Sequence, residues 1–213
     1  VRDRELDGRK ETFQELVQKG LGGFLVRNME SYGILDAMGL TYRIVLDANI
    51  YTMNNRAEAF WMKKGILGDT VPLELNAKEL VHRNNKNSEL TVYGYTPMMV
   101  SVQCVQKTMD HCNHACVQYV LKDRYQKEFR GVCSCEFCYN TIYNTLPTSL
   151  LKEKEKAEKL GVKAYRLSFT IETQQETEKI VRAFVDVYLR GQKPDGQMQT
   201  EETTKGHFQR GVE

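Results

Sequence analysis

Cysteine is absent from most of this chain, and that absence makes one segment stand out. The 213-residue sequence contains 6 cysteines, and all of them lie between Cys104 and Cys138. Cysteines that only pack are usually scattered through a fold as small buried residues. Thiolates gathered in one segment can instead converge on one point, as metal ligation requires, so we expect a metal centre here.

Long apolar runs are also missing. No run approaches the ~20 residues that a membrane-spanning helix needs, and residues 1–10 lack the apolar stretch of a secretion signal. We therefore expect a cytoplasmic protein without a membrane segment. Thiols stay reduced in that compartment, where grouped cysteines favour metal or redox chemistry over disulfides.

An excess of one charge is missing as well. The chain has 30 basic and 28 acidic residues and a net charge of +2, so its composition gives no electrostatic footprint for nucleic acid beyond a local patch. Hydrophobic residues make up 41% of the chain, which is enough for one sizeable core.

Several catalytic motifs are absent too. The sequence has no H-E-x-x-H and no G-x-S-x-G, which argues against a zinc peptidase helix and a serine nucleophile elbow. No G-x-G-x-x-G follows a predicted strand, which weakens a dinucleotide-binding interpretation. A nucleophilic pair of Cys112 with His111 or His114 remains as an alternative.

Outside the cysteine-rich segment, strand-like and helix-like stretches alternate with the period of a βα unit. Strands are predicted at 23–28, 42–47, 71–75, 90–95 and 164–169. Helices are predicted at 12–19, 32–38, 56–64, 77–82, 150–160 and 173–189, and 191–205 is predicted to be a loop. This rhythm favours a parallel sheet with right-handed crossovers.

The predicted fold is therefore α/β: a partial (β/α)8 TIM-like barrel with a cysteine-rich insertion. A complete barrel takes ~250 residues, so this chain would supply only part of one. The first helix has no strand before it, and we expect the chain to be the C-terminal part of a longer protein. An open doubly wound sheet is the alternative. We divide the chain into βα units (1–103), a metal-binding segment (104–148) and a final βα unit with a C-terminal motif (149–213).

The cysteine spacing is C-x7-C-x3-C-x16-C-x-C-x2-C. A structural zinc site favours two short C-x2-4-C pairs, which Cys112/Cys116 and Cys135/Cys138 could provide. An iron–sulfur cluster tolerates irregular spacing, which suits the isolated Cys104 better. Spacing alone leaves zinc and iron–sulfur equally favoured.

Three stretches in and around the cysteine-rich segment, at 98–104, 119–124 and 140–144, resemble the collagenase-like peptidase family U32. The resemblance extends to 47–49 with Asn54, to 74–76 and to the terminal stretch 206–213, so it covers nearly the whole chain. It is closest to the C-terminal portion of the large clostridial-type members, whose barrel is divided by an inserted domain.

What this resemblance implies is twofold. The family carries a peptidase label, whereas its better understood relatives bind a [4Fe–4S] cluster through four cysteines and hydroxylate RNA bases or a quinone precursor. The first three family cysteines correspond to Cys104, Cys112 and Cys116. The fourth corresponds best to Cys138, with Cys135 or Cys133 as the alternative.

Polar side chains at predicted strand ends are the candidates for binding substrate, because parallel barrels place their chemistry at the carboxyl ends of the strands. Helix capping and ion pairing are the competing roles for each of them. The candidates include two residues of the C-terminal motif, and they are Asp47, Asn49, Glu74, Asn76, Arg166, His207 and Arg210.

These observations favour an iron–sulfur enzyme of the U32 family that modifies tRNA or rRNA. Its expected partners are an RNA or polypeptide substrate and the remaining half of the barrel. The alternatives are a collagenase-like peptidase that hydrolyses peptide bonds and a zinc-stabilised interaction module.

Overall fold

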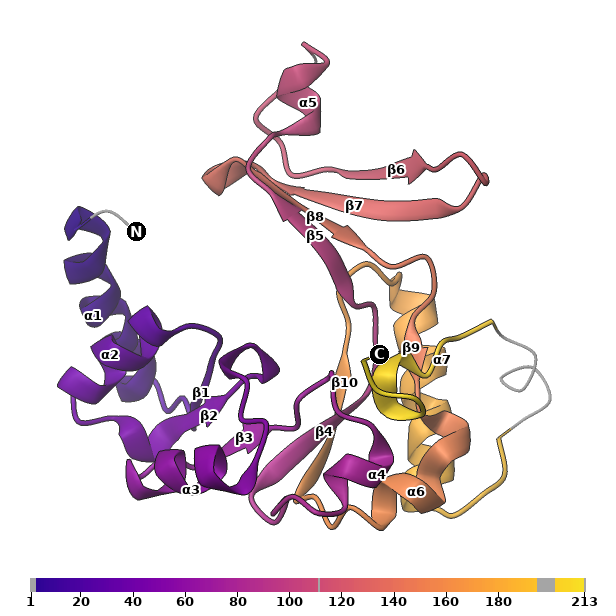
Figure 1. The fold of residues 1–213 in the computed structure, drawn as a ribbon. Helices are drawn as coiled ribbons and strands as arrows, with labels where there is room; N and C mark the ends of the chain where they lie inside the picture. Colours follow the sequence, from indigo (N-terminus) through magenta and orange to yellow (C-terminus); the bar gives the residue numbers. More distant parts are fainter. Residues whose placement is uncertain (1–2, 111, 195–201, 213) are drawn as a thin grey trace. The chain divides into compact units, whose positions relative to one another are not determined.

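The computed structural model of the protein describes residues 3–110, 112–194 and 202–212. Figure 1 shows its helices and strands. The chain divides into two compact units: residues 1–91, 155–165 and 207–213 form unit 1, and residues 92–154 and 166–206 form unit 2. Within the described residues, no helix is long and apolar enough to cross a membrane.

Unit 1 is built on parallel strands: β1 (Phe24–Val26), β2 (Ile44–Leu46), β3 (Gly68–Thr70) and the first half of β4 (Ser88–Gly94). Each pairs with the next in parallel register. The strand β10 (Ala164–Ser168) follows β4 in the order β1-β2-β3-β4-β10, and both β4 and β10 end in unit 2. This parallel sheet confirms the predicted α/β class, although the described residues do not show a closed barrel.

Helices alternate with these strands, as the βα rhythm predicts, and the first of them precedes β1. They are α1 (Asp3–Gln18), α2 (Met29–Ala37), α3 (Asn55–Lys63), α4 (Ala77–Leu80) and α6 (Lys154–Glu158). Side chains of Asn28, Asn54 and Asn76 accept hydrogen bonds from the first backbone N–H groups of α2, α3 and α4. Such caps satisfy donors that the helix itself cannot, which explains why each helix begins where it does.

The core of unit 1 lies where α2 and α3 pack on the sheet. Its buried residues include Leu35, Ile44, Leu46 and an edge-to-face pair, Tyr32 and Trp61, with ring centroids 4.8 Å apart. Aliphatic residues of the short strands and the aromatic pair thus seal one face of the sheet.

The predicted strand at 71–75 is wrong, because β3 lies three residues earlier. Alternating apolar residues favoured 71–75. The strand that pairs with its neighbours is instead Gly68–Thr70, whose polar side chains form hydrogen bonds. Thr70 donates to Glu89 (2.8 Å), and Asp69 accepts from Ser88 (2.6 Å). Gly68 permits this pairing, since a Cβ there would lie 2.2 Å from the Asn87 carbonyl oxygen.

Unit 2 contains a four-stranded antiparallel sheet that carries the cysteine-rich segment. Its strands are β5 (Pro97–Ser101), β6 (Gln118–Lys122), β7 (Glu128–Ser134) and β8 (Tyr139–Tyr143), in the order β5-β8-β7-β6. The β6–β7 turn is fixed by Asp123, whose carboxylate accepts the backbone N–H groups of Tyr125 and Lys127 at 2.8 and 2.9 Å. The short helix α5 (Val105–Thr108) follows β5.

The remainder of unit 2 contains β9 (Thr148–Ser149), which pairs antiparallel with the end of β4, and α7 (Gln174–Phe184). A π-helical segment, Val185–Leu189, continues α7 to the end of the helix predicted at 173–189. Short 3-10 turns complete the two units at Thr41–Arg43, Ala48–Ile50, Cys135–Phe137, Leu151–Glu153 and Gly206–Phe208. Residues 195–201 of the predicted loop at 191–205 lie outside the described residues.

Candidate metal centre

Four parts of the unit 2 fold carry the six cysteines. Cys104 is the N-cap of α5, Cys133 lies in β7, Cys135 begins the following 3-10 turn, and Cys138 ends that turn in the left-handed conformation (φ 53°). The other two lie between α5 and β6. Cys104 and Cys133 are buried, Cys135 is half-buried, and the remaining three are exposed: Cys112, Cys116 and Cys138.

Two of the thiols form a buried pair. The Sγ atoms of Cys104 and Cys133 lie 3.7 Å apart. The backbone N–H of Lys107 lowers the pKa of Cys104, and the hydrogen bond with Cys133 acts in the same direction. Burial raises the pKa of Cys133 to about 12, and the adjacent Cys104 adds to this. Cys104 is therefore the more acidic thiol of the pair.

A second group gathers at Cys135. Ligand atoms of Cys112, His114 and Cys135 all lie within 4.8 Å of one another. Burial raises the pKa of Cys135, and the nearby thiols of Cys112, Cys138, Cys116 and Cys104 raise it further. Cys135 therefore lies close to Cys112 and His114, and its pKa responds to four other thiols.

This donor set fits a metal. Thiolate and imidazole ligands select zinc or iron–sulfur clusters over magnesium and calcium. Two thiolates on one tetrahedral zinc ion lie ~3.8 Å apart for bonds of ~2.3 Å, close to the spacing of Cys104 and Cys133. Thiolates on a [4Fe–4S] cluster bind separate irons, so their sulfur atoms lie farther apart than on one zinc ion. The half-buried Cys135 and the four thiols near it could provide such a set. The arrangement supports a metal site and leaves the type of metal open.

Polar groups beside the buried Cys104–Cys133 pair also support a metal site. Asn140 lies opposite Cys133 in the β7–β8 ladder, and its side-chain amide donates to the Gln103 carbonyl oxygen at 2.8 Å. That bond ties the segment entering Cys104 to β8. Three side-chain oxygens near the pair are buried and have no hydrogen-bond partner among the described residues: Gln106 Oε1, Tyr119 Oη and Asn140 Oδ1. Buried polar atoms are normally satisfied, so three exceptions here point to a group that would complete the site.

Unit 1 contains six of the predicted substrate-binding residues, and four of them lie outside the C-terminal motif. Asp47 is buried after β2 and forms an ion pair with Arg27 after β1 (2.9 Å), whereas Asn49 is exposed. Glu74 follows β3, and its Oε2 atom is buried without a hydrogen-bond partner among the described residues. Asn76 caps α4 in a reciprocal capping box with Glu79.

The C-terminal motif in unit 1 folds back on α4. His207 Nδ1 lies 2.9 Å from the Gly211 carbonyl oxygen, and a Cβ on Gly211 would lie 2.9 Å from the Asn76 amide nitrogen. The structure thus brings Asn76 and the turn that starts at His207 together. Arg210 is exposed within that turn, and the last residue, Glu213, lies outside the described residues.

The last predicted residue, Arg166, lies on the part of β10 in unit 2. That unit also contains a cavity of about 670 Å³ with polar and aromatic walls. Glu172, which follows β10, lines it, and its Oε2 atom accepts the backbone N–H groups of Thr170 (2.7 Å) and Ile171 (3.0 Å). Tyr93 and Tyr95 at the end of β4 also line this cavity.

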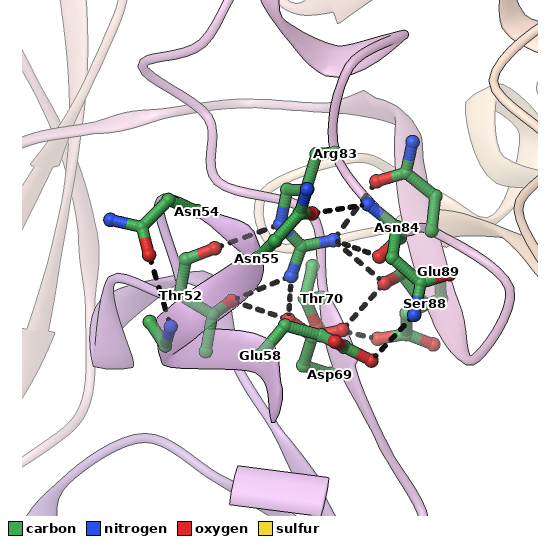
Figure 2. Close-up of polar contacts among 12 residues, drawn as sticks. Thr52, Asn54, Asn55, Glu58, Asp69, Thr70, Arg83, Asn84, Ser88 and Glu89 are labelled. Atoms are coloured by element: carbon green, nitrogen blue, oxygen red, sulfur yellow. Dashed lines mark hydrogen bonds and ion pairs between the residues drawn. The ribbon is translucent and has the colours of Figure 1, made fainter. Parts of the chain in front are cut away.

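The buried ionic network of unit 1, shown in Figure 2, was not predicted from the sequence. The Arg83 guanidinium pairs with Asp69 and donates to the Thr52 carbonyl oxygen (2.8 Å), Asn85 (2.9 Å) and Ser88 (2.9 Å). Arginine is seldom buried unless it is paired, and its partners here include Asp69 in β3, Ser88 in β4 and Thr52, which is 31 residues away. The network joins the loop before α3, strand β3 and the loop before β4.

Comparison with known families decides the classification. The family model of peptidase family U32 matches residues 1–213. The chain belongs to peptidase family U32. No curated protein and no solved structure matches it. Membership of U32 indicates an enzyme, and it does not by itself name the reaction.

The sequence offered two cysteine–histidine pairs for a peptidase, and the structure describes only the one with His114. His111 lies outside the described residues, whereas His114 lies beside Cys112 and Cys135. An imidazole next to a thiol could activate it as a nucleophile. The same geometry suits a metal ligand, and the gathering of further thiols favours the metal.

Proposed function

We propose that this U32 protein is an iron–sulfur enzyme that hydroxylates bases of tRNA or rRNA in the cytoplasm. The observation that supports it most is the convergence of thiols on Cys135. Four thiolates of that group would hold the [4Fe–4S] cluster: Cys104, Cys112, Cys116 and either Cys138 or Cys135. Cys133 is the remaining alternative for the fourth ligand, because its Sγ atom lies 3.7 Å from that of Cys104.

When bound, the cluster would supply one-electron transfer. Replacing a C–H bond of the base by C–OH inserts one oxygen atom and removes two electrons, so a co-substrate from the cell would have to supply the oxygen atom and accept the electrons. The residues of the chain hold and shield that site. Buried Cys104 and Cys133 exclude water from one side of it, and Asn140 fixes the backbone beside Cys104.

For substrate, we propose the polar groups at the carboxyl ends of the parallel strands, on the general rule that parallel sheets bind ligands there. In unit 1 these are the predicted residues around Asp47, Glu74 and Asn76. In unit 2 the cavity lined by Tyr93, Tyr95 and Glu172 is large enough for one nucleotide and offers aromatic faces for stacking. We further propose that the parallel sheet is part of a (β/α)8 barrel that other strands of a longer protein complete.

Nucleoside mass spectrometry tests this function. RNA from cells that express the wild-type protein is compared with RNA from cells that carry Cys112→Ser in the chromosomal gene, so that the cell supplies any co-substrate. One nucleoside should lose a single oxygen atom in the variant, while Tyr125→Phe, at the exposed β6–β7 turn, should leave it unchanged. Identical nucleoside profiles in all three strains would contradict the proposal.

A collagenase-like peptidase is the second candidate, and the proximity of His114 to Cys112 and Cys135 favours it. A thiol peptidase needs no metal, so gelatin cleavage by metal-free protein that Cys112→Ser abolishes would establish this alternative. A zinc-stabilised interaction module would show neither activity and would contain zinc.

A further inference from the structure

Tyr119 lies on the same face of the antiparallel sheet as the buried cysteine pair. It is paired directly with Gly131 in the β6–β7 ladder, and Cys133 is two residues farther along β7. Residues i and i+2 of a strand share a face, and a long side chain reaches its diagonal neighbour on the next strand. The register alone therefore directs Tyr119 towards Cys133.

Gly131 makes room for the tyrosine ring. A Cβ on Gly131 would lie 2.3 Å from the Tyr119 Cζ atom and 2.7 Å from its hydroxyl oxygen. The ring thus lies directly over the glycine backbone. Any side chain at position 131 would displace the hydroxyl.

The hydroxyl itself lacks a hydrogen-bond partner. Tyr119 Oη is buried and bonds to none of the described residues. A tyrosine hydroxyl is protonated at neutral pH and can therefore donate a hydrogen bond. A buried hydroxyl left unsatisfied costs ~1–3 kcal/mol, which a suitable acceptor would remove.

We propose that the Tyr119 hydroxyl donates a hydrogen bond to a cysteine sulfur of the bound metal centre, in the Cys104–Cys133 pair. A thiolate that ligates a metal is an anionic acceptor, and groups that bond to ligands tune both the affinity and the potential of the metal. Tyr119 is thus a positioning residue. The inference rests on the proposed function only in that a metal is bound, and it applies to a cluster and to zinc alike.

The test compares anaerobically purified wild-type protein with Tyr119→Phe, which keeps the ring over Gly131 and removes the hydroxyl. Tyr125→Phe, in the turn of the same hairpin, is the matched control. Transfer of metal to a chelator should be ~10-fold faster from Tyr119→Phe and unchanged in the control. If the metal is a cluster, its midpoint potential should also fall, because a hydrogen bond to sulfur stabilises the more negative reduced state.

Equal release rates for folded Tyr119→Phe and wild type would overturn the inference. Failure of a folded Tyr119→Phe protein to retain metal at all would support it. Should circular dichroism show Tyr119→Phe to be unfolded, Gly131→Ala provides the second variant, since its methyl group displaces the hydroxyl; it should release metal faster, and a wild-type rate would again overturn the inference. The identity of the metal in the wild-type protein tests the proposed function separately, because iron supports it and zinc contradicts it.

Discussion

Arg83 is the residue on which the stability of unit 1 depends most strongly. Its side chain is 2% exposed, and that of its partner Asp69 is 5% exposed. Replacing Arg83 by methionine leaves Asp69 as an unpaired buried charge, which typically costs ~3–5 kcal/mol. We expect the free energy of unfolding, measured by urea titration, to fall by about that amount.

Arg182→Met is the matched control for that experiment. Arg182 pairs with Glu178 on the exposed face of α7, where an i,i+4 ion pair contributes only ~0.5 kcal/mol or less. A similar loss in both variants would mean that the Arg83 network does not act as a buried ion pair.

The cysteines show how much of the candidate site could be predicted from individual residues. Their clustering predicted a metal centre, and the structure does bring thiols together. His114 was named only as a possible partner of Cys112 in a nucleophilic pair, and the structure does place the two together. Tyr119 was not predicted, because its position depends on which strand lies opposite. The β6–β7 register that brings Tyr119 over Gly131 is a property of the folded hairpin rather than of local sequence.

At the scale of elements, the N-terminus of α7 gives a pH-dependent prediction. Thr173 and Glu176 form a reciprocal capping box, and the Thr173 backbone N–H lowers the pKa of Glu176. A lowered folded-state pKa contributes stability above the ordinary value of 4.5, and this contribution is lost as the pH falls through the folded-state value.

We therefore expect Glu176→Gln to make thermal stability less dependent on pH below 4.5 than it is in the wild type. Thr173→Ala should lower stability at neutral pH by ~1 kcal/mol, the usual value of an N-cap. Glu178→Gln, two residues along the same helix, serves as the control. Melting curves between about pH 3 and pH 7, a range that spans the ordinary glutamate pKa of 4.5, check both expectations. Parallel curves for Glu176→Gln and wild type would contradict the first.

Elements whose ends carry strong local signals were predicted well. Asparagine caps and glycines mark the ends of α2 and α3, and both helices lie within a few residues of their predicted positions. The β3 strand was misplaced because its residues, Gly68–Thr70, are polar and buried. The partners that Ser88 and Glu89 of β4 supply, together with Arg83, make such a strand stable.

At the scale of the whole molecule, metal should stabilise the two units unequally. The cysteine sheet carries many exposed apolar side chains, among them Met98, Met99 and Val100 of β5, so its own packing is weak. Metal binding adds its free energy to the fold that forms the site. Removing the metal should therefore speed amide hydrogen exchange in β5 to β8 while exchange in β1 to β3 stays unchanged.

Hydrogen exchange with mass spectrometry measures both regions in one sample of the full chain. The strands of unit 1 are the internal control, because their core contains no cysteine. Equal acceleration in both units would show that the metal supports the whole fold rather than the cysteine sheet.

The central claim is that the gathered thiols hold an iron–sulfur cluster, and elemental analysis of anaerobically purified protein tests it most directly. The account predicts a brown protein with about four irons and four sulfides per chain, and Cys112→Ser should reduce both. A colourless protein with one zinc per chain would contradict it.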